Sequence, residues 1–461
     1  MTAIVKPLPQ SRAIVLLGLI VLTACRPAPA GSPAVPATAT PILTTSMSTT
    51  LSSATNLADS STPAELPPSP TPSPTPQPAR PTPTMIPWER NVSSMGRLSV
   101  AEGWAVVGDR LLWTDDAGAS WSDITPAGLS NCPPPDVCSI ASAAVFFDPT
   151  HARMVVLRFQ EQDPRMTLSL MDTLNGGSSW SLSVVDELGA DPLCPGPGCL
   201  RDVDLEFLDE RNGWLWAHAP LGMQNEQFYL YRTRDGGQSW TELAKYDDSG
   251  TGGPGYVPRM PILHQIAFID AWSGWATGGW RWDTDSFVVS RDGGRSWQSV
   301  ILDTPERYAN MELAYHDPVF FSRVSGMLPV RLNGPEGRGQ VLGFYTTGDA
   351  GGSWQLTATL EDSELERFCC DDRIPWSAID ESTWFVAVGE AKQYLTRDRG
   401  QSWEVIAGAG LNGLELSEVQ FVTEAEGWAR GRSCAQGVGC VSPLFGTHDG
   451  GRTWTHIIPG S

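Results

Sequence analysis

Hydrophobic positions along the chain occur in short runs of β-branched and aromatic residues, separated by glycine-rich or polar turns. Residues 264–302 show the pattern well, with the successive runs HQIAFID, GWATGGW, SFVVSRD and SWQSVIL. Helical periodicity is hard to find, and Gly, Pro and Trp are abundant at 46, 38 and 19 residues. Short runs of this kind between turn signals predict an all-β protein.

One short sequence, called the box below, recurs seven times as Ser/Thr-x-Asp/Asn-x-Gly-x-Ser/Thr-Trp, for example in VSRDGGRSW (289–297). A catalytic group is normally needed once, so seven copies favour a structural turn. In such a turn the acidic side chain accepts backbone N–H groups, the glycine two places on supplies a positive φ, and the tryptophan packs between strands. The third and last positions of the boxes are Asp116, Asn175, Asp235, Asp292, Asp349, Asp398 and Asp449, and Trp121, Trp180, Trp240, Trp297, Trp354, Trp403 and Trp454.

The boxes belong to a longer repeat, because a Gly-Trp run such as AEGWAVVG (101–108) precedes most of them. Four strands per unit, with closing tryptophans 49 to 60 residues apart, predict a β-propeller blade. We therefore predict a seven-bladed β-propeller of four-stranded blades over residues 88–461. Blades 2 and 5 are the weak copies, since residues 152–159 and 324–332 replace the Gly-Trp run. How the ring closes stays open, and residues 87–91 could add a strand to the last blade.

The first 25 residues are predicted to be a lipoprotein signal peptide. Lys6 and Arg12 precede an apolar run (13–24) that is too short to span a bilayer. The run ends in LTAC (22–25), which resembles the bacterial lipobox and would make Cys25 the lipidated residue; an ordinary secretory signal is the alternative. Residues 26–87 contain no aromatic residue and are rich in Pro, Thr, Ser and Ala, which predicts a disordered linker. We expect an extracytoplasmic head, anchored to the bacterial cell membrane by lipid only.

The formal net charge of −21 argues against nucleic acid and anionic lipid headgroups as partners. Cysteines in close pairs predict disulfides in an oxidising compartment, whereas the state of the adjacent Cys369 and Cys370 stays open. No C-x-x-C spacing or histidine cluster occurs, so we predict no metal and no cofactor. The predicted pairs are Cys132 with Cys138, Cys194 with Cys199, and Cys434 with Cys440.

All eight of these cysteines map to long loops on the face opposite the boxes, where we expect function to lie. On that face Trp280 and Trp282, beside Asp283 and Asp285, are candidates for binding a sugar or a basic peptide. Alternation along a strand sends only one of the two tryptophans outward. Weaker candidates are Tyr256 with Arg259, and Phe368 with Arg373. No arginine cluster is predicted, because Arg201, Arg211, Arg281 and Arg331 are spread over different blades.

The box resembles the Asp-box, or bacterial neuraminidase repeat, of sialidases and several non-enzymatic propellers. The fuller unit, a Gly-Trp run followed by a box such as YRTRDGGQSW (231–240), more closely resembles the photosystem II stability and assembly factor family. Members of that family are seven-bladed propellers, the cyanobacterial ones are lipoproteins, and an arginine-rich patch engages their partners. The resemblance implies a non-catalytic binding or assembly scaffold, whose partner is a protein such as a membrane protein complex under assembly.

An exo-sialidase is the enzymatic alternative. Such an enzyme needs three arginines for the substrate carboxylate, a Tyr nucleophile with a Glu, and an Asp acid/base. Sialidases also carry an aromatic-Arg-Ile-Pro motif ahead of the first box. Here Arg373-Ile374-Pro375 lies between the fifth and sixth boxes and follows Asp372, so we predict no catalytic residue. A carbohydrate-binding surface protein and an exo-sialidase-type glycoside hydrolase remain the alternatives.

Overall fold

The structure is a computed structural model. It describes residues 91–460 except 131, 133–135, 141–143, 161–162, 189–201, 221–225, 247–262, 281–282, 335–338, 368–373, 390–391, 412 and 436–438. These residues belong to one of the two compact units of the chain; the other, residues 11–84, lies outside the described residues. The predicted signal peptide, Cys25 and linker therefore lie outside them as well. Among the described residues, no helix is both long and apolar enough to cross a membrane.

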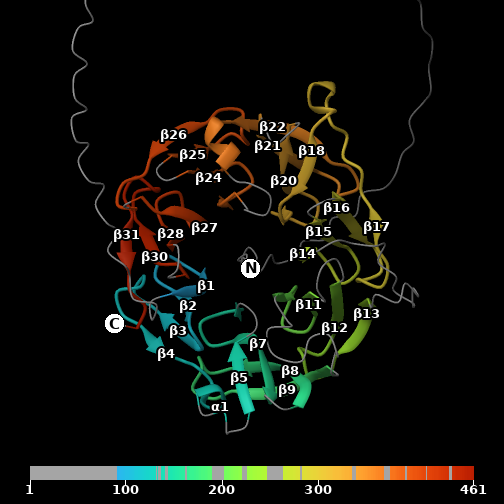
Figure 1. Cartoon of the computed structure of the whole chain (residues 1–461), viewed down its shortest axis with the longest axis vertical. Helices are drawn as coiled ribbons and strands as arrows, with labels where there is room; N and C mark the ends of the chain where they lie inside the picture. Colours follow the sequence, from blue (N-terminus) through green and yellow to red (C-terminus); the bar gives the residue numbers. More distant parts are fainter. Residues whose placement is uncertain are drawn as a thin grey trace, which may run out of the picture. The chain divides into compact units, whose positions relative to one another are not determined.

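The described residues confirm an all-β, seven-bladed propeller of four-stranded blades. Seven antiparallel sheets follow one another around a centre, and β1, β14 and β27 lie on the side of their sheets that faces it (Figure 1). Blades 1 to 4 consist of β1 (Val92–Arg97), β2 (Gly103–Val107), β3 (Arg110–Thr114) and β4 (Ser122–Asp123); β5 (Asp136–Ile140), β6 (Val145–Phe146), β7 (Ala152–Gln160), β8 (Asp163–Thr173) and β9 (Ser181–Leu188); β10 (Asp202–Phe207), β11 (Gly213–Pro220), β12 (Glu226–Thr233) and β13 (Thr241–Tyr246); and β14 (Leu263–Phe268), β15 (Gly274–Trp280), β16 (Asp283–Ser290) and β17 (Gln298–Ser299).

The remaining blades follow the same order. Blades 5 to 7 consist of β18 (Glu312–Tyr315), β19 (Val319–Phe320), β20 (Gly326–Asn333), β21 (Val341–Thr347) and β22 (Gln355–Glu361); β23 (Trp376–Ala378), β24 (Trp384–Val388), β25 (Lys392–Thr396) and β26 (Glu404–Ala407); and β27 (Glu415–Phe421), β28 (Gly427–Ala435), β29 (Gly439–Val441), β30 (Leu444–Thr447) and β31 (Thr455–Ile457). Short helices α1 (Ala127–Ser130), η3 (Glu306–Tyr308) and η5 (Ser363–Arg367) lie in the connections between blades.

The two weak copies of the repeat have a first strand in two pieces. In blade 2 both β5 and β6 pair with β7, and in blade 5 both β18 and β19 pair with β20. In blade 5 the interruption falls at Pro318, which has no N–H to continue the ladder. The second strand nevertheless occupies the place of the Gly-Trp strand in both blades.

Buried tryptophans of the second strands fill the space between blades. Trp104, Trp214, Trp275, Trp384 and Trp428 are all at most 1% exposed. Trp214 stacks on Phe268 of blade 4, with 3.6 Å between ring centroids, and Trp275 packs on Phe320 of blade 5 at 4.6 Å. At the position of Trp214 and Trp275 stand Arg153 and Met327 in the weak blades and Phe385 in blade 6. Aromatic contact between neighbouring blades is therefore a main part of the core.

Each box closes the turn between the third and fourth strands. In blade 1, Asp116 Oδ1 accepts from the Ser120 N–H (2.8 Å) and Asp116 Oδ2 from the Ser120 hydroxyl (2.6 Å). The Thr114 hydroxyl donates to Asp116 and accepts the N–H of Gly118, whose φ is +95°. The Trp121 indole donates to the Gly118 carbonyl (3.0 Å). The box is thus a closed local network of hydrogen bonds.

A further hydrogen bond ties each box to the turn between the first two strands of its own blade. The N–H of the residue after the box Asp or Asn donates to a carbonyl in that turn, at 2.7 to 3.0 Å in all seven blades. Both turns lie at the same end of the antiparallel sheet. We call this end of the propeller the box face, and the opposite end the insertion face.

The ring closes by contact between blades 7 and 1. Residues 92–97 form the first strand of blade 1 and do not add a strand to blade 7. The Val92 N–H donates to the Ser442 carbonyl (2.9 Å). Gln420 Oε1 accepts the Arg97 N–H (2.8 Å), and Gln420 Nε2 donates to the Arg97 carbonyl (3.2 Å). Arg97 also lies over the Trp428 ring and 3.8 Å from Glu426.

Candidate functional site

The predicted binding residues lie largely outside the described part of the chain. Trp282, Tyr256, Arg259 and Arg373 are outside it, and only the backbone of Trp280 is described, at the end of β15. Phe368 and the cysteines Cys194, Cys199, Cys369 and Cys370 are also outside it. The insertion face therefore stays a prediction for these residues.

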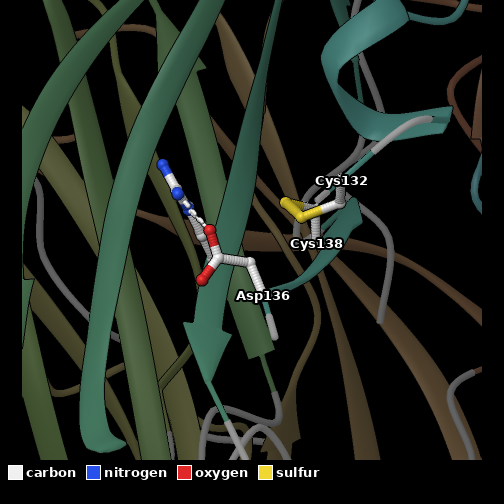
Figure 2. The surroundings of a disulfide bond; sticks show 4 residues. Cys132, Asp136 and Cys138 are labelled. Carbon is white, nitrogen blue, oxygen red and sulfur yellow. Dashed lines mark hydrogen bonds and ion pairs between the residues drawn. A yellow bond between two sulfur atoms is a disulfide. The ribbon is translucent and has the colours of Figure 1, made fainter. Parts of the chain in front are cut away.

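One predicted disulfide is present, between Cys132 and Cys138, whose Cα atoms are 5.9 Å apart. Figure 2 shows it beside β5, with Asp136 labelled on the same strand. Asp136 accepts from the Arg158 Nε (2.6 Å), so an ion pair and a disulfide fix the same short strand. Cys434 and Cys440 face each other in the register of β28 and β29, which is the placement their predicted pairing requires.

The base of the long 361–375 loop is fixed by Asp362. This carboxylate accepts from the Lys392 ammonium, the Tyr394 hydroxyl and the Glu364 N–H. Burial works to raise the pKa of Asp362, but these donors outweigh it and the pKa is lowered. The cluster holds the start of a predicted functional loop in place.

An exposed tryptophan stands on the box face between blades 3 and 4. Trp272 lies in the turn between β14 and β15 and is 54% exposed. Asp270 Oδ1 accepts the N–H groups of Trp272 and Ser273, both at 2.7 Å, and the Trp272 carbonyl accepts the Gly293 N–H of the box (2.8 Å). A large aromatic side chain is therefore presented to solvent on a rigid backbone.

Two arginines of blade 3 lie close to this tryptophan. Arg232 lies 5.8 Å and Arg234 5.6 Å from the Trp272 ring centroid. The pKa of Arg232 is lowered to about 10, first by burial and then by repulsion from Arg234 and Arg295. Arg234 and Arg295 are thus both close enough to repel the charge of Arg232, and Asp292 offsets part of this repulsion. We call Arg232, Arg234, Trp272 and Arg295 the arginine–tryptophan patch.

Two arginines of this patch differ from those of other blades in having no carboxylate partner among the described residues. Arg234 and Arg295 are exposed, and no carboxylate of the described residues forms an ion pair with either. In blades 6 and 7 the arginines of the same face are all paired. Arg397 binds Glu404 (2.8 Å) and Glu424 (2.7 Å), and Arg452 binds Glu404 (2.7 Å). Arg234 and Arg295 are therefore exposed arginines without an ion-pair partner among the described residues of an acidic protein, while buried Arg232 is attracted by Asp292.

This cluster was missed by the sequence analysis, which considered other arginines and expected no cluster. The signal lies in the boxes YRTRDGGQSW and VSRDGGRSW, which hold Arg232, Arg234 and Arg295. Because the box was interpreted only as a turn, its variable positions were not considered as surface. Consecutive boxes lie on neighbouring blades, so arginines about 60 residues apart in sequence meet in space.

The described residues give little support to sialidase chemistry. Tyr308 donates to Glu361 at 3.1 Å, but Glu361 ends β22, the outermost strand of blade 5. A sialidase Tyr–Glu couple has to face the centre of the ring, so this pair does not provide it. Among the described residues, no group of three or more His, Cys, Asp or Glu is placed to hold a metal ion.

Comparison with known proteins gives distant similarities among solved structures. No protein-family model matches the chain, and no curated protein matches it. It is similar to YCF48 bound to D1 peptide (16% identity, TM-score 0.45, 79% of this chain and 93% of that chain). It is also similar to YCF48 from Cyanidioschyzon merolae (15%, 0.44, 79% and 97%) and to a PL25 ulvan lyase (11%, 0.41, 68% and 81%). Similarity at this level assigns no activity to the chain.

Proposed function

We propose that this protein is a non-catalytic binding scaffold that recognises an acidic segment of a partner protein through the arginine–tryptophan patch. The observation that carries the proposal is Trp272, half exposed on a rigid turn and set between Arg232 and Arg234. Tryptophan and arginine are the residues most enriched at the energetic centre of protein interfaces.

The chemistry of the patch favours an acidic protein segment over a sugar. A sugar stacks on a free aromatic face, whereas the Trp272 ring already has two guanidinium groups within 6 Å of its centroid. Guanidinium groups bind carboxylates through two parallel hydrogen bonds. The resemblance of the repeat to the photosystem II stability and assembly factor family, whose members use an arginine-rich patch, supports the same function.

The proposal also includes where the protein is located in the cell. We propose that lipid at Cys25 holds the protein at the outer side of a bacterial membrane, so that the head meets membrane protein complexes. Replacing Cys25 by serine is expected to move the protein from the membrane fraction to the soluble fraction on cell fractionation. Retention of the Cys25→Ser protein in membranes would contradict lipid anchoring.

A pull-down from detergent-solubilised membranes, with the full-length protein as bait, tests the scaffold function. We expect a reproducible membrane-protein partner whose recovery falls with rising salt, because exposed charges are screened. Arg234→Ala and Trp272→Ala should each weaken recovery by roughly tenfold or more, as loss of an interface hot spot costs about 2 kcal/mol or more. Arg110→Ala is the matched control, since Arg110 is exposed and already paired with Asp123 at 2.9 Å.

Two results would contradict the proposal. A partner retained equally by the Arg234→Ala and Trp272→Ala variants would show that the patch is not the binding surface. Release of sialic acid from a fluorogenic substrate, abolished by Arg373→Ala, would show that the protein is a sialidase.

A further inference from the structure

Arginines bridge neighbouring blades on the box face at several positions around the ring. Arg153 of blade 2 donates to the Glu210 carbonyl of blade 3 (2.8 Å). Arg232 of blade 3 donates to the Ala271 carbonyl of blade 4 (2.6 Å). Arg291 of blade 4 reaches the Gly351 carbonyl of blade 5 (3.3 Å), and Arg397 of blade 6 binds Glu424 of blade 7. A guanidinium group is therefore a recurrent filler of the groove between two blades.

Three of these arginines also lie over an aromatic ring. Arg153 is 4.9 Å from the Phe147 centroid, Arg232 is 5.0 Å from that of Trp214, and Arg291 is 5.0 Å from that of Trp275. These three grooves thus share a ring below and carbonyl groups at the side. Both features attract a planar cation.

The groove between blades 5 and 6 lacks such an arginine. The repeat places Met327 where blade 2 has Arg153, Thr346 where blade 3 has Arg232, and Gly348 where blade 4 has Arg291. None of these three side chains can supply a guanidinium group. A pocket of about 380 Å³ lies here instead, lined among others by Phe321, Thr346, Gly348, Asp349, Glu381 and Arg399.

The lining keeps groups like those that receive Arg153 in the groove between blades 2 and 3. Phe321 has the place in blade 5 that Phe147 has in blade 2. The Phe147 N–H donates to the His151 carbonyl, and the Phe321 N–H donates to the carbonyl of the equivalent residue, Ser325. The Glu381 carbonyl corresponds to those of Glu210 and Ala271, and among the described residues no donor reaches it. Asp349 adds a negative charge, whereas the charge of Glu381 is compensated by Arg399, the arginine of the lining, at 2.6 Å.

We propose that the pocket between blades 5 and 6 receives an arginine side chain of a partner protein. The guanidinium group would lie over Phe321 and donate to the Glu381 carbonyl and to a carboxylate, as Arg153 lies over Phe147 and donates to the Glu210 carbonyl and to Asp172. The inference rests on this pocket alone and not on the arginine–tryptophan patch. A substitution that abolishes binding at one of the two sites is therefore expected to leave binding at the other unchanged.

Saturation-transfer NMR with the full-length protein and the blocked amino acid Nα-acetyl-arginine amide tests the proposal. We expect saturable binding of the arginine probe and at least several-fold weaker binding of Nα-acetyl-lysine amide. A lysine ammonium cannot make the planar, forked contacts of a guanidinium group. Absence of binding by the arginine probe, or equal binding of both probes, would overturn the proposal.

A variant that places an arginine of the protein itself in the pocket provides the decisive test. A side chain added at Gly348 meets open space, and its φ is not positive, so Gly348→Arg can reproduce the arrangement of Arg291. We expect Gly348→Arg to weaken binding of the arginine probe at least tenfold and Gly348→Ala to leave it unchanged. Thr346→Arg, which copies the placement of Arg232, is the second filling variant should Gly348→Arg fold poorly. Unchanged binding in a folded filling variant would overturn the proposal.

Discussion

At the scale of single residues, the box carboxylate is both an acceptor of hydrogen bonds and a charge. In blade 2 the position is Asn175, whose Oδ1 accepts the Ser179 N–H at 2.9 Å and whose Nδ2 donates to the Ser179 hydroxyl at 2.8 Å. In blade 7 Asp449 Oδ1 accepts the Thr453 N–H at 2.8 Å, and Asp449 Oδ2 accepts from the Thr453 hydroxyl at 2.6 Å. An amide can thus replace the carboxylate without loss of the turn.

Substitutions at Asp449 separate these two roles. Asp449→Asn is expected to change the free energy of unfolding little, whereas Asp449→Ala should lower it by about 1 to 3 kcal/mol, because the donors of the turn lose their acceptor. Urea unfolding followed by tryptophan fluorescence measures both. Asn175→Asp is the reciprocal control and should be close to neutral. Equal effects of the Asn and Ala substitutions would mean that the charge itself is needed.

At the scale of the element, two successive box positions have a positive φ but different surroundings. In blade 2, Gly176 has φ +65°, and a Cβ there would approach no atom closer than 3.4 Å. At Gly177, with φ +84°, a Cβ would lie 2.5 Å from the Ile124 Cβ. The first of these positions is Ala117, Ala350 or Arg399 in other blades, whereas the second is always glycine.

The pair Gly176→Ala and Gly177→Ala tests whether close packing explains the invariant second glycine. Gly176→Ala should cost about 1 to 2 kcal/mol from the left-handed backbone alone. Gly177→Ala should cost about 2 to 5 kcal/mol, since backbone strain and overpacking against Ile124 add. Urea unfolding of the two variants under identical conditions gives the comparison. Costs of equal size would show that packing against the neighbouring blade is unimportant.

The local signal of the repeat explains why the fold was predictable. Each box with its glycine and tryptophan specifies one turn, and seven turns at regular spacing require seven sheets. The divided first strands of blades 2 and 5 were not predicted, because in both blades the partner strand continues past the break, which in blade 5 falls at Pro318. The patch around Trp272 was missed because its charge arises only when two blades come together. The pocket was missed for a similar reason, since it arises from small side chains at Thr346 and Gly348.

At the scale of the whole molecule, the box carboxylates link stability to pH. The pKa of Asp116 is lowered from 3.8 to about 2, first by the Ser120 hydroxyl and then by the Ser120 N–H and the Thr114 hydroxyl. The pKa of Asp349 is lowered to about 2 by the Ser353 N–H and hydroxyl and the Thr347 hydroxyl. A carboxyl group with a lower pKa in the folded state stabilises the fold above its unfolded pKa.

The stabilisation is therefore present above about pH 4 and lost as the pH falls through the folded pKa values near 2. We expect the free energy of unfolding, measured in urea at each pH, to decline between about pH 4 and pH 2. The double variant Asp116→Asn, Asp349→Asn should show a shallower decline, because two of the titrating groups are gone. A stability that does not change with pH over this range would refute the linkage.

Closure of the ring uses side chains besides the backbone hydrogen bond from Val92 to Ser442, because blade 1 consists of the start of the head and blade 7 of its end. Gln420 Oε1 accepts the buried Arg97 N–H across this junction, as Ser377 Oγ accepts the Phe421 N–H between blades 6 and 7 (3.0 Å). Removing either acceptor leaves a buried N–H without its partner, which costs about 1 to 3 kcal/mol. Between blades 6 and 7 the covalent connection still holds the junction together.

Gln420→Ala should therefore lower the free energy of unfolding more than Ser377→Ala does, since no peptide chain joins blade 7 directly to blade 1. Local opening at this junction would also increase hydrogen exchange of the β1 amides, which hydrogen exchange with mass spectrometry detects. Ser377→Ala is expected to leave exchange in β1 unchanged. Equal destabilisation by the two variants, with β1 equally protected in both, would mean that apolar packing around Trp428 closes the ring without the Gln420 contact.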